Sequence, residues 1–580
     1  MFDRRTIMAL VVVGLILLLL PKYYQLITPK APPATEVVAP DSVTTPTDSP
    51  PVTTPQVTES APPAATPVST VPQAPLAADT AQLMADFVDI ETPLYHMTIA
   101  SNGLVSGYEL KEYQAKAGDP VALHVARTAG KEMVGAVDFN FGSTNPKTLK
   151  NLRFQASKAR IFLSGSGADS VVLTAGDPTT QFISLTYVFQ SESYGFQVAL
   201  STGGLSIPET GEYQIKWIGG VPVTEPNPIS DLQYSGAYAQ IGSELEKVHV
   251  GGDPEKTFQA TGQTFFMAAR SKYFMAAVIP QDPAAGIDIV GRNPTPKVKE
   301  SPQYYELSLR EMWGPAANGR WAVYWGPIKY ENLKAFGVGL DETMNWGWQI
   351  IKPFSKGVLW SLTALRTYIP NYGWVIVIFS ILVKIILWPL TRKSQVSMKK
   401  MAALQPEIKE LRELHKNNPQ AMNAAMMKLY KDRGVNPASG CIPILFQMPI
   451  LYALFIVFST TIEFRQAPFM LWITDLSLPD IVFHLPFSIP LYGAGVAILP
   501  LVMGVTQFFM SRATATDPNQ KMMIYIMPVF MTLIFNQFPS GLTLYYTLFN
   551  VLAMVEQRLI KLPDFTPSAE VVDEKKSKKK

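Results

Sequence analysis

The stretch that decides the fold reads Tyr372-Gly-Trp-Val-Ile-Val-Ile-Phe-Ser-Ile-Leu-Val-Lys-Ile-Ile-Leu-Trp-Pro-Leu390. It is apolar apart from Ser380 and Lys384, and about 20 such residues suffice for a helix to cross a bilayer. Five further apolar stretches cover Ile7–Leu20, Ile442–Ile462, Ala494–Met510, Met522–Phe538 and Leu542–Ile560. The sequence therefore predicts a polytopic α-helical membrane protein with six spans.

The N-terminal stretch has two interpretations, a cleavable signal peptide or an anchor. Arg4 and Arg5 precede it, and Pro21-Lys-Tyr-Tyr24 follows it with no small-x-small cleavage site nearby. This favours an uncleaved transmembrane anchor over residues 1–27. Residues 28–82 contain 13 prolines and no aromatic residue. Such a composition cannot bury enough apolar surface to offset its ordering entropy, so we predict a disordered linker.

Residues 83–340 have the sequence pattern of a large β-sandwich outside the membrane. They consist of short segments in which apolar and polar residues alternate, and they contain no apolar run of membrane length. Clear examples are Phe182–Gln190, Tyr213–Ile218, Tyr304–Leu309 and Trp321–Trp325. Residues 341–369 then mix tryptophans and cations with a partial apolar stripe. This pattern favours an amphipathic helix in the headgroup layer, and a helix packed on the sandwich is the alternative.

The distribution of basic residues predicts the orientation. Loop 391–440 carries ten Lys or Arg against four acidic residues, and the chain ends in Lys575-Lys-Ser-Lys-Lys-Lys580. If six spans alternate, these regions lie on one side with Arg4, Arg5 and the 511–521 loop, which the positive-inside rule makes the cytoplasmic side. Both termini are then cytoplasmic, and the sandwich lies on the opposite side of the membrane.

The composition gives no sign of an enzyme. The net charge of +3 does not favour nucleic acid, and the single cysteine, Cys441, excludes a disulfide-stapled scaffold. The five histidines are isolated, and no phosphate-binding loop, dinucleotide fingerprint or nucleophile elbow is present. We therefore expect no catalytic residues, no metal site, no cofactor and no small-molecule substrate.

Lys384 is the one charged residue within the predicted span Tyr372–Leu390. A charge within a span costs several kcal/mol and usually faces protein or water, although a lysine this close to Leu390 could also snorkel to the interface. Ser380 lies one turn earlier on the same face, which favours a polar stripe. Gln447, Asn536, Gln537 and Asn550 could extend it into a polar concavity, or each could serve helix–helix hydrogen bonding.

The basic loop 391–440 predicts two amphipathic helices, broken at His415–Pro419, that form a cytoplasmic hairpin. Its apolar residues could offer an adaptable contact surface or could pack the two helices against each other. The candidate contact residues are Met401, Leu404, Ile408, Leu411, Met422 and Met426. The basic tail, residues 563–580, would contact lipid headgroups or ribosomal RNA, or simply be solvated.

Several longer strings resemble the YidC/Oxa family of membrane protein insertases, in its Gram-negative form with a large periplasmic domain. They are Val383–Thr391, Asn436–Pro443, Gln447–Ile450, Glu463–Ser477, Thr516–Pro518 and Phe538–Gly541. The resemblance is densest over 371–561, and for the periplasmic domain it rests mainly on size and strand texture.

The resemblance implies a five-span insertase core, residues 370–562, that encloses a hydrophilic groove with one basic residue. That position is occupied here by Lys384, where the family usually has arginine, so the planar fork of donors is lost. Ser380, Gln447, Tyr545 and Tyr546 match positions along the groove or the substrate path. The periplasmic domain would be a β-supersandwich related to sugar-binding folds, with no catalytic role.

The implied function is insertion and folding of nascent membrane proteins in the bacterial inner membrane, alone or with the Sec translocon. Nascent membrane proteins, the Sec translocon, the ribosome and the phospholipid bilayer would be the partners. A secondary transporter is an alternative, but no internal repeat relates two halves of the chain. A carbohydrate-binding periplasmic protein is less suitable, because five clustered spans exceed what an anchor needs.

Overall fold

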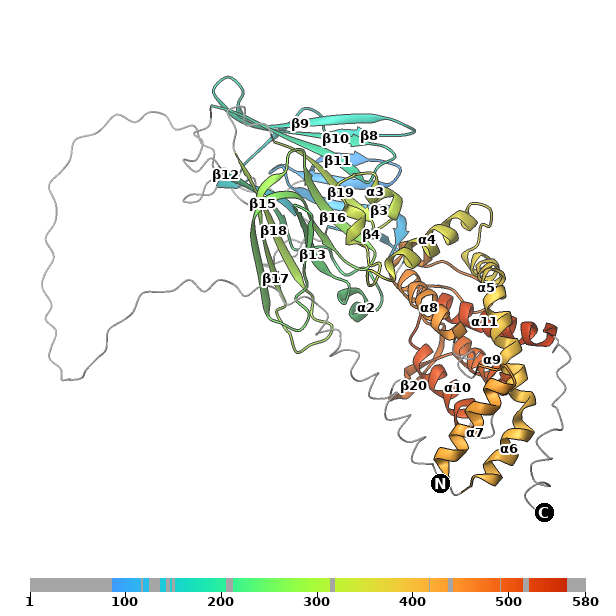
Figure 1. Ribbon diagram of the computed structural model, residues 1–580. Helices are drawn as coiled ribbons and strands as arrows, with labels where there is room; N and C mark the ends of the chain where they lie inside the picture. Colours follow the sequence, from blue (N-terminus) through green and yellow to red (C-terminus); the bar gives the residue numbers. More distant parts are fainter. Residues whose placement is uncertain are drawn as a thin grey trace, which may run out of the picture. The chain divides into compact units, whose positions relative to one another are not determined.

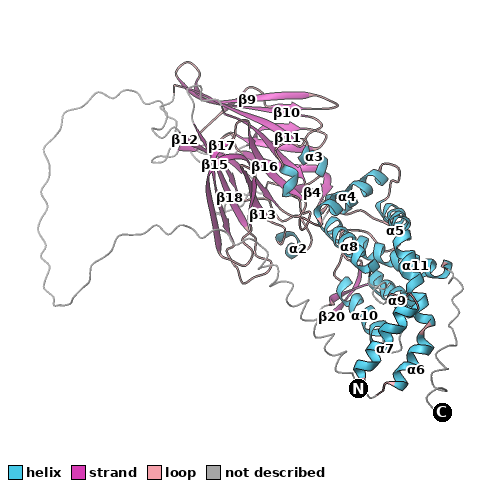
Figure 2. Ribbon diagram, in the orientation of Figure 1, coloured by secondary structure: helices cyan, strands magenta, loops and turns pink. Residues whose placement is uncertain are grey.

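We analysed a computed structural model of the full chain (Figure 1). The structure describes residues 86–115, 118–124, 136–141, 147–148, 152–204, 212–312, 319–416, 418–436, 442–490, 492–514 and 521–560. The predicted anchor, the linker and the basic tail lie outside these ranges. Figure 2 shows that strands dominate the chain before α4 and helices dominate after it.

The first part of the described chain consists of two antiparallel-rich sheets. The smaller has the order β4-β3-β2-β1-β8, with β1 Asp86–Glu91, β2 Tyr95–Ala100, β3 Val105–Gln114, β4 Pro120–Ala122 and β8 Arg160–Phe162. The larger has 14 strands. Twelve follow the order β6-β5-β12-β18-β17-β15-β16-β19-β11-β10-β9-β7, and in addition β13 pairs with β15 and β14 pairs with β13. Its strands are β5 Ala136–Phe141, β6 Lys147–Thr148, β7 Gln155–Ala156, β9 Ala168–Asp177, β10 Gln181–Gln190, β11 Gly195–Gly203, β12 Glu212–Ile218, β13 Gly236–Ile241, β14 Glu244–Val248, β15 Glu255–Arg270, β16 Phe274–Pro280, β17 Ala284–Arg292, β18 Tyr304–Met312 and β19 Gly319–Pro327.

Alternation along the strands creates the core of this domain. In β10, Ile183, Leu185, Tyr187 and Phe189 are buried while the residues between them are not, as expected for side chains that point alternately to the two faces of a sheet. The large sheets confirm the prediction of a β-rich domain in this part of the chain. Strands β9, β10 and β11 lie side by side in Figure 1.

Aromatic side chains join the two sheets. The Tyr108 ring of β3 stacks on Trp325 of β19 at 4.4 Å, and its hydroxyl donates to the Trp325 carbonyl at 2.7 Å. Tyr95 stacks on the other side of Tyr108 at 4.9 Å. Such rings bury large apolar areas in a defined geometry, so they fix the packing of the smaller sheet on the larger one.

The rest of the described chain is mostly helical. Short helices α2 Pro228–Leu232, α3 Tyr330–Lys334 and η2 Leu340–Thr343 accompany the sheets. They are followed by α4 Lys352–Arg366, α5 Tyr372–Ala403, α6 Gln405–Leu414, α7 Pro419–Asp432, α8 Ile442–Thr460, η4 Ile462–Phe464, α9 Ile498–Thr514, α10 Lys521–Phe535 and α11 Ser540–Leu559. In α4, Val358, Leu359 and Leu362 are buried, whereas Trp360 is exposed. One face of α4 therefore packs on protein while an aromatic residue stays on the surface.

The structure supports a helical membrane core more clearly than it supports the number of spans. Among the described residues, only α5 is long and apolar enough to cross a bilayer. Phe446–Thr460, Ile498–Arg512 and Ile524–Phe535 are apolar but shorter, and α11 carries Glu556 and Arg558 near its end. The six-span count therefore stays a prediction.

One predicted span was wrong at its start. The stretch Ala494–Met510 does not begin as a helix, because Gly493–Ala497 forms strand β21, which pairs with β20, Ile481–Ile489. Helix α9 begins only at Ile498. Small apolar residues suit a strand and a span equally well by composition, so hydropathy alone does not separate them.

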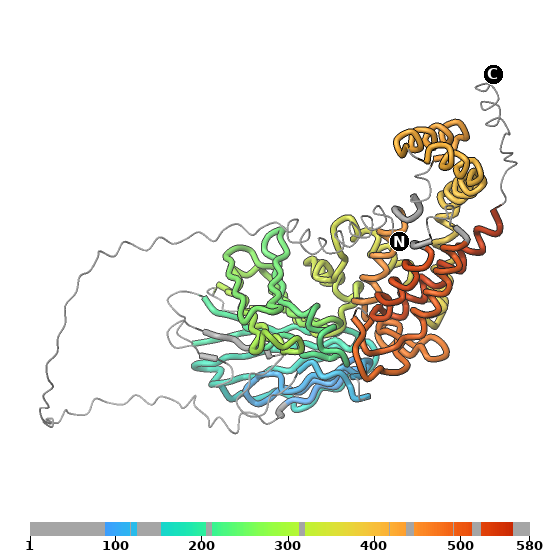
Figure 3. The backbone as a smooth tube through the Cα atoms, turned by 90° about the horizontal axis from the view of Figure 1, so that it is seen from below, coloured from blue at the N-terminus to red at the C-terminus, as the bar shows by residue number. Residues whose placement is uncertain are grey.

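Helices α5, α8, α9, α10 and α11 pack together. Helix α11 contacts α5, α8 and α9, and α10 contacts α9. Figure 3 shows the C-terminal helices, coloured orange to red, running alongside one another. The two helices predicted for the basic loop are present as α6 and α7, which also contact each other. The predicted start of the hairpin was wrong, because α5 continues to Ala403 and includes Met401.

Candidate functional site

Helix α5 holds Lys384 inside the helical bundle. Its first turn is capped by Asn371, whose side-chain oxygen accepts a hydrogen bond from the Gly373 N–H at 2.8 Å. Ser380 and Lys384 lie one turn apart on the same face, and both are buried. The Ser380 hydroxyl donates to the Ile376 carbonyl at 2.7 Å, so it stays within the helix.

The Lys384 ammonium faces a carboxylate of another helix. Its Nζ lies 2.7 Å from Oε2 of Glu556 on α11, and the two side chains are 9% and 1% exposed. The Thr391 hydroxyl donates to Oε1 of Glu556 at 2.5 Å. The Phe549 ring lies 4.4 Å from Lys384 Nζ and stacks on Tyr545 at 6.3 Å. Lys384 thus points into the bundle and not along the helix toward its end.

Sequence reasoning missed Glu556. Its only signal was an acidic residue near the end of an apolar stretch, the same kind of signal that identified Lys384. The two residues are far apart in the chain, and only the packing of α11 on α5 brings them together. Because an unpaired buried charge is strongly destabilising, the presence of one such residue should prompt a search for its partner.

The other predicted groove residues divide into two groups. Gln447 on α8 donates from Nε2 to the Tyr545 hydroxyl at 2.9 Å, and Tyr545 packs near Phe379. These residues therefore belong with Lys384. Tyr546 instead lies against Phe535 of α10, with ring centroids 5.3 Å apart. It is adjacent to Tyr545 in sequence but on a different face of α11.

Several buried polar atoms in this bundle have no hydrogen-bond partner among the described residues. They include Oε1 of Gln447, Oε1 of Gln507, Oδ1 of Asn550 and Nε2 of Gln557, and Oε2 of Glu556 has an ion-pair contact with Lys384 but no hydrogen bond of good geometry. The Asn550 amide donates to Thr506 at 3.3 Å, yet its oxygen is left over. Leaving such a group unsatisfied in a dry interior costs about 1–3 kcal/mol. The arrangement suits a region that receives water or polar groups of a ligand.

Asn536 belongs to a different network. Its Oδ1 accepts from the Ala497 N–H at 3.0 Å, and its Nδ2 donates to the carbonyls of Tyr492 and Gly495 at 2.8 and 2.7 Å. It therefore fixes the β20–β21 hairpin on α10, and its amide is already used. Asn536 therefore has a structural role in this network.

An apolar hollow of about 780 Å³ lies between this hairpin and helices α9 and α10. Its lining includes Leu485, Phe508, Tyr525 and Pro528. None of the predicted groove residues lines it, and its walls carry no charged side chain. It is therefore separate from the polar region around Lys384.

The hairpin of α6 and α7 has its own small core. Leu404, Ile408, Leu429 and Val435 are buried there, and Met401, Leu411 and Met426 pack against them. Arg433 donates to both carboxylate oxygens of Glu407, at 3.1 and 3.2 Å, and this ion pair also joins the two helices. The structure thus uses most of the predicted contact residues for packing the hairpin itself, whereas Met427 is exposed.

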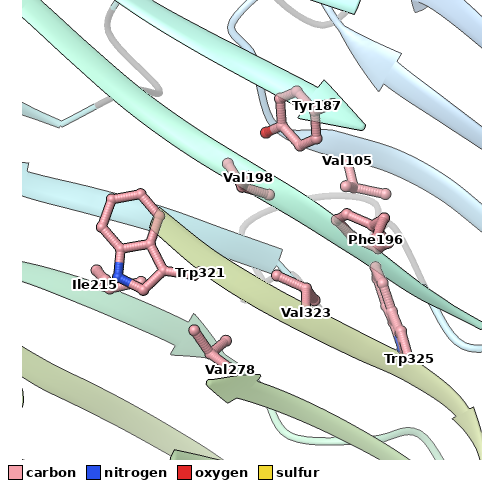
Figure 4. A pocket seen from close by; sticks show the side chains of 9 residues that line it. All are labelled: Val105, Tyr187, Phe196, Val198, Ile215, Val278, Trp321, Val323 and Trp325. Atoms are coloured by element: carbon pink, nitrogen blue, oxygen red, sulfur yellow. The ribbon is translucent and has the colours of Figure 1, made fainter. Parts of the chain in front are cut away.

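The β-sandwich encloses a cavity too small for a sugar. It measures about 10 Å³ and is lined by aliphatic and aromatic side chains, which point toward one another in Figure 4. A volume of this size holds at most one water molecule. The cavity therefore gives no support to a carbohydrate-binding function.

One histidine that is isolated in the sequence meets two carboxylates in the structure. The register of β1 and β2 places His96 Nε2 2.6 Å from Asp89 and 4.0 Å from Glu91. Three potential metal-ligand atoms lie within 4.8 Å of one another. Lys111 pairs with Glu91 and Arg160 pairs with Asp89, so the carboxylates already have cationic partners.

Comparison with known proteins agrees with this architecture. Residues 87–357 match the family model described as the YidC periplasmic domain, and residues 364–565 match that of the 60Kd inner membrane protein. The membrane protein insertase YidC of Chloroherpeton thalassium is 34% identical over 518 residues, which cover 85% of this chain and 86% of the relative. The chain belongs to the YidC family.

Other relatives lead to the same family. The membrane protein insertase YidC of Chlorobium luteolum is 37% identical over 68% of this chain and 71% of its own length. That of Prosthecochloris aestuarii is 39% identical over 64% of this chain and 65% of its own length. A crystal structure of an active YidC insertase covers 83% of this chain at 17% identity, but its TM-score of 0.34 is too low to support a comparison of folds. The family is that of an inner-membrane protein with a periplasmic domain.

Proposed function

We propose that this protein inserts nascent membrane proteins into the inner membrane, and that the polar region around Lys384 receives the hydrophilic flank of the incoming segment. Family membership supports the activity, because relatives of comparable length are named membrane protein insertases. The proposed location rests on the buried Lys384–Glu556 pair, in a bundle that also buries the polar side chains of Gln447 and Asn550.

The physical account starts from the cost of moving a polar flank through hydrocarbon. Each charged residue at the centre of a bilayer costs several kcal/mol, and a polar groove shortens the path over which that cost applies. The unsatisfied amides of Gln447, Asn550 and Gln557 offer donors and acceptors to such a flank. The apolar part of the substrate then partitions into lipid by burial of its own surface. This mechanism makes and breaks no covalent bond.

The topology belongs to the same proposal. Six spans would place both termini and loop 391–440 in the cytoplasm and residues 83–340 in the periplasm. The basic residues of the loop and of the tail support this orientation through the positive-inside rule. Single cysteines at Ser511 and at exposed Lys297, in a variant whose Cys441 is replaced by serine, would react with a membrane-impermeant maleimide from opposite sides.

The partners are also proposed from charge. The hairpin of α6 and α7 and the C-terminal tail are rich in lysine and arginine, which suits them to anionic lipid or to ribosomal RNA. The resemblance to the insertase family implies the Sec translocon as a further partner. Because most apolar residues of the hairpin pack internally, we assign its contact with substrate or ribosome to its exposed surface, which includes Met427.

Reconstitution of the purified chain into liposomes tests the function. The substrate is a short single-span protein with an acidic translocated flank, and insertion is scored by protease protection. We expect insertion by wild type and Lys384→Arg above that of protein-free liposomes, and a loss of about tenfold in Lys384→Ala, which corresponds to ~1.4 kcal/mol. The exposed-lysine variant Lys297→Ala is the control.

Each alternative outcome has a defined meaning. Wild-type liposomes that insert no more than protein-free ones would contradict autonomous insertion. Full activity in Lys384→Ala would leave the insertase activity intact but remove Lys384 from its mechanism.

A further inference from the structure

The ammonium of Lys384 is not a free positive charge. Glu556 pairs with it at 2.7 Å, and both side chains are almost completely buried. The Thr391 hydroxyl holds the other carboxylate oxygen at 2.5 Å, which orients Oε2 toward Lys384. The Phe549 ring lies over the ammonium at 4.4 Å. The centre of the polar region therefore carries one positive and one negative charge, with a formal sum of zero.

We propose that Glu556 is a specificity-determining residue, which together with Lys384 forms a two-signed site that accepts substrate flanks of either charge. This inference rests on the insertase function proposed above and adds the substrate class. An incoming carboxylate pairs with Lys384 in place of Glu556, and an incoming ammonium or guanidinium pairs with Glu556 in place of Lys384.

The exchange of partners predicts that neither sign of charge is favoured. A lone buried cation attracts acidic flanks and repels basic ones, whereas a paired cation presents both signs at short range. In either exchange one residue of the pair gains a substrate partner, and the other loses the partner that it has in the free protein. The same bundle buries an acceptor, Asn550 Oδ1, and a donor, Gln557 Nε2, that have no hydrogen-bond partner among the described residues.

A purely structural role for the ion pair makes a different prediction. If the pair only holds α5 against α11, its loss lowers the insertion of all substrates by the same factor. If the pair selects substrates, its two members have opposite effects on the ratio between acidic and basic flanks. The ratio of two substrates on one preparation also cancels differences in the amount of folded protein.

The experiment compares three single-span substrates that differ only in an acidic, neutral or basic translocated flank. Liposomes contain wild type, Glu556→Gln, Lys384→Gln, the charge swap Lys384→Glu/Glu556→Lys, or Glu109→Gln as an exposed carboxylate control. We expect wild type to insert acidic and basic flanks with similar efficiency. The acidic-to-basic ratio should rise about tenfold in Glu556→Gln and fall about tenfold in Lys384→Gln.

The charge-swap variant controls for misfolding of the single variants, because it keeps a buried pair of opposite charges. We expect it to return the ratio to that of wild type. An unchanged ratio in both single variants would overturn the inference while leaving the insertase function intact, whatever the overall yield. A wild type that strongly prefers acidic flanks would also overturn it. A wild type that inserts none of the three substrates contradicts the function itself, and the inference then fails with it.

Discussion

Lys384 on α5 and Glu556 on α11 form an ion pair at 2.7 Å between buried side chains. Removing one partner of such a pair leaves an uncompensated charge, which costs about 3–5 kcal/mol, whereas replacing both with apolar residues is often neutral. We therefore expect Lys384→Met to lower the thermal stability of the detergent-solubilised chain, and Lys384→Met/Glu556→Leu to recover most of the loss. A double variant with the summed loss of Lys384→Met and Glu556→Leu would show that the two side chains do not interact.

Asn536→Ala should loosen the β20–β21 hairpin. The side chain makes hydrogen bonds to Ala497, Tyr492 and Gly495, and its loss leaves these buried backbone groups unsatisfied at a cost of about 1–3 kcal/mol. Hydrogen exchange of the full chain should show faster exchange of the β21 amides. Asn423→Ala, at an exposed position on α7, should leave them unchanged. Equal protection in wild type and Asn536→Ala would refute the assignment.

The loop after α8 is tied to the β-sandwich by a buried ion pair. Arg465 Nε lies 2.8 Å from Glu225, with side chains 2% and 7% exposed, and Arg465 also donates to the Gln114 carbonyl at 2.8 Å. Arg465→Met should leave Glu225 unpaired and destabilise this contact by about 3–5 kcal/mol. Limited proteolysis should then cleave within 463–477 much faster than in wild type, and Glu225→Gln should have a similar effect because it leaves the buried Arg465 charge unpaired. Cleavage at the wild-type rate in both variants would contradict the assignment.

Glu311, at the end of β18, predicts that the stability of the β-sandwich depends on pH. Burial raises the pKa of its carboxyl to about 7, although the Trp321 N–H, 3.4 Å from Oε1, acts in the opposite direction. The folded state thus holds this proton more tightly than the unfolded chain does. The contribution of protonated Glu311 to folding stability is complete below the ordinary pKa of 4.5. It is lost as the pH rises through about 7.

Substitution of Glu311 by glutamine should remove this dependence. Between pH 5 and pH 8 we expect the free energy of unfolding of wild type to fall by about 1–2 kcal/mol relative to that of Glu311→Gln, after allowance for solvent screening. Hydrogen exchange of the β18 and β19 amides in the full chain, corrected for intrinsic rates, measures the difference. Parallel pH profiles for the two proteins would mean that Glu311 titrates normally.

The sequence predicted those features that repeat along the chain. The alternation in Phe182–Gln190 is visible residue by residue, because a strand exposes every second side chain to the same surroundings, and it forms β10 as expected. The apolar stretch from Tyr372 and the periodicity of the basic loop likewise identified α5, α6 and α7.

Features that depend on packing between distant segments were not predictable in this way. Nothing near Lys384 in the sequence indicates Glu556, and nothing near Arg465 indicates Glu225. Strand β21 was mistaken for the start of a span because Gly493–Ala497 is apolar, and its hydrogen-bond partner Asn536 lies far along the chain. These interactions become visible only when the helices and strands are placed in space.

The central claim is that a substrate flank enters the polar region next to Lys384, and site-specific photo-crosslinking tests it most directly. A photoreactive amino acid would replace Gln447, which faces Tyr545 in the bundle, or Ile386, which is exposed on the outer surface of α5. A stalled single-span nascent chain supplies the substrate. The account predicts crosslinks from position 447 to the hydrophilic flank and few from position 386. Equal crosslinking from both positions, or crosslinks from position 386 alone, would contradict it.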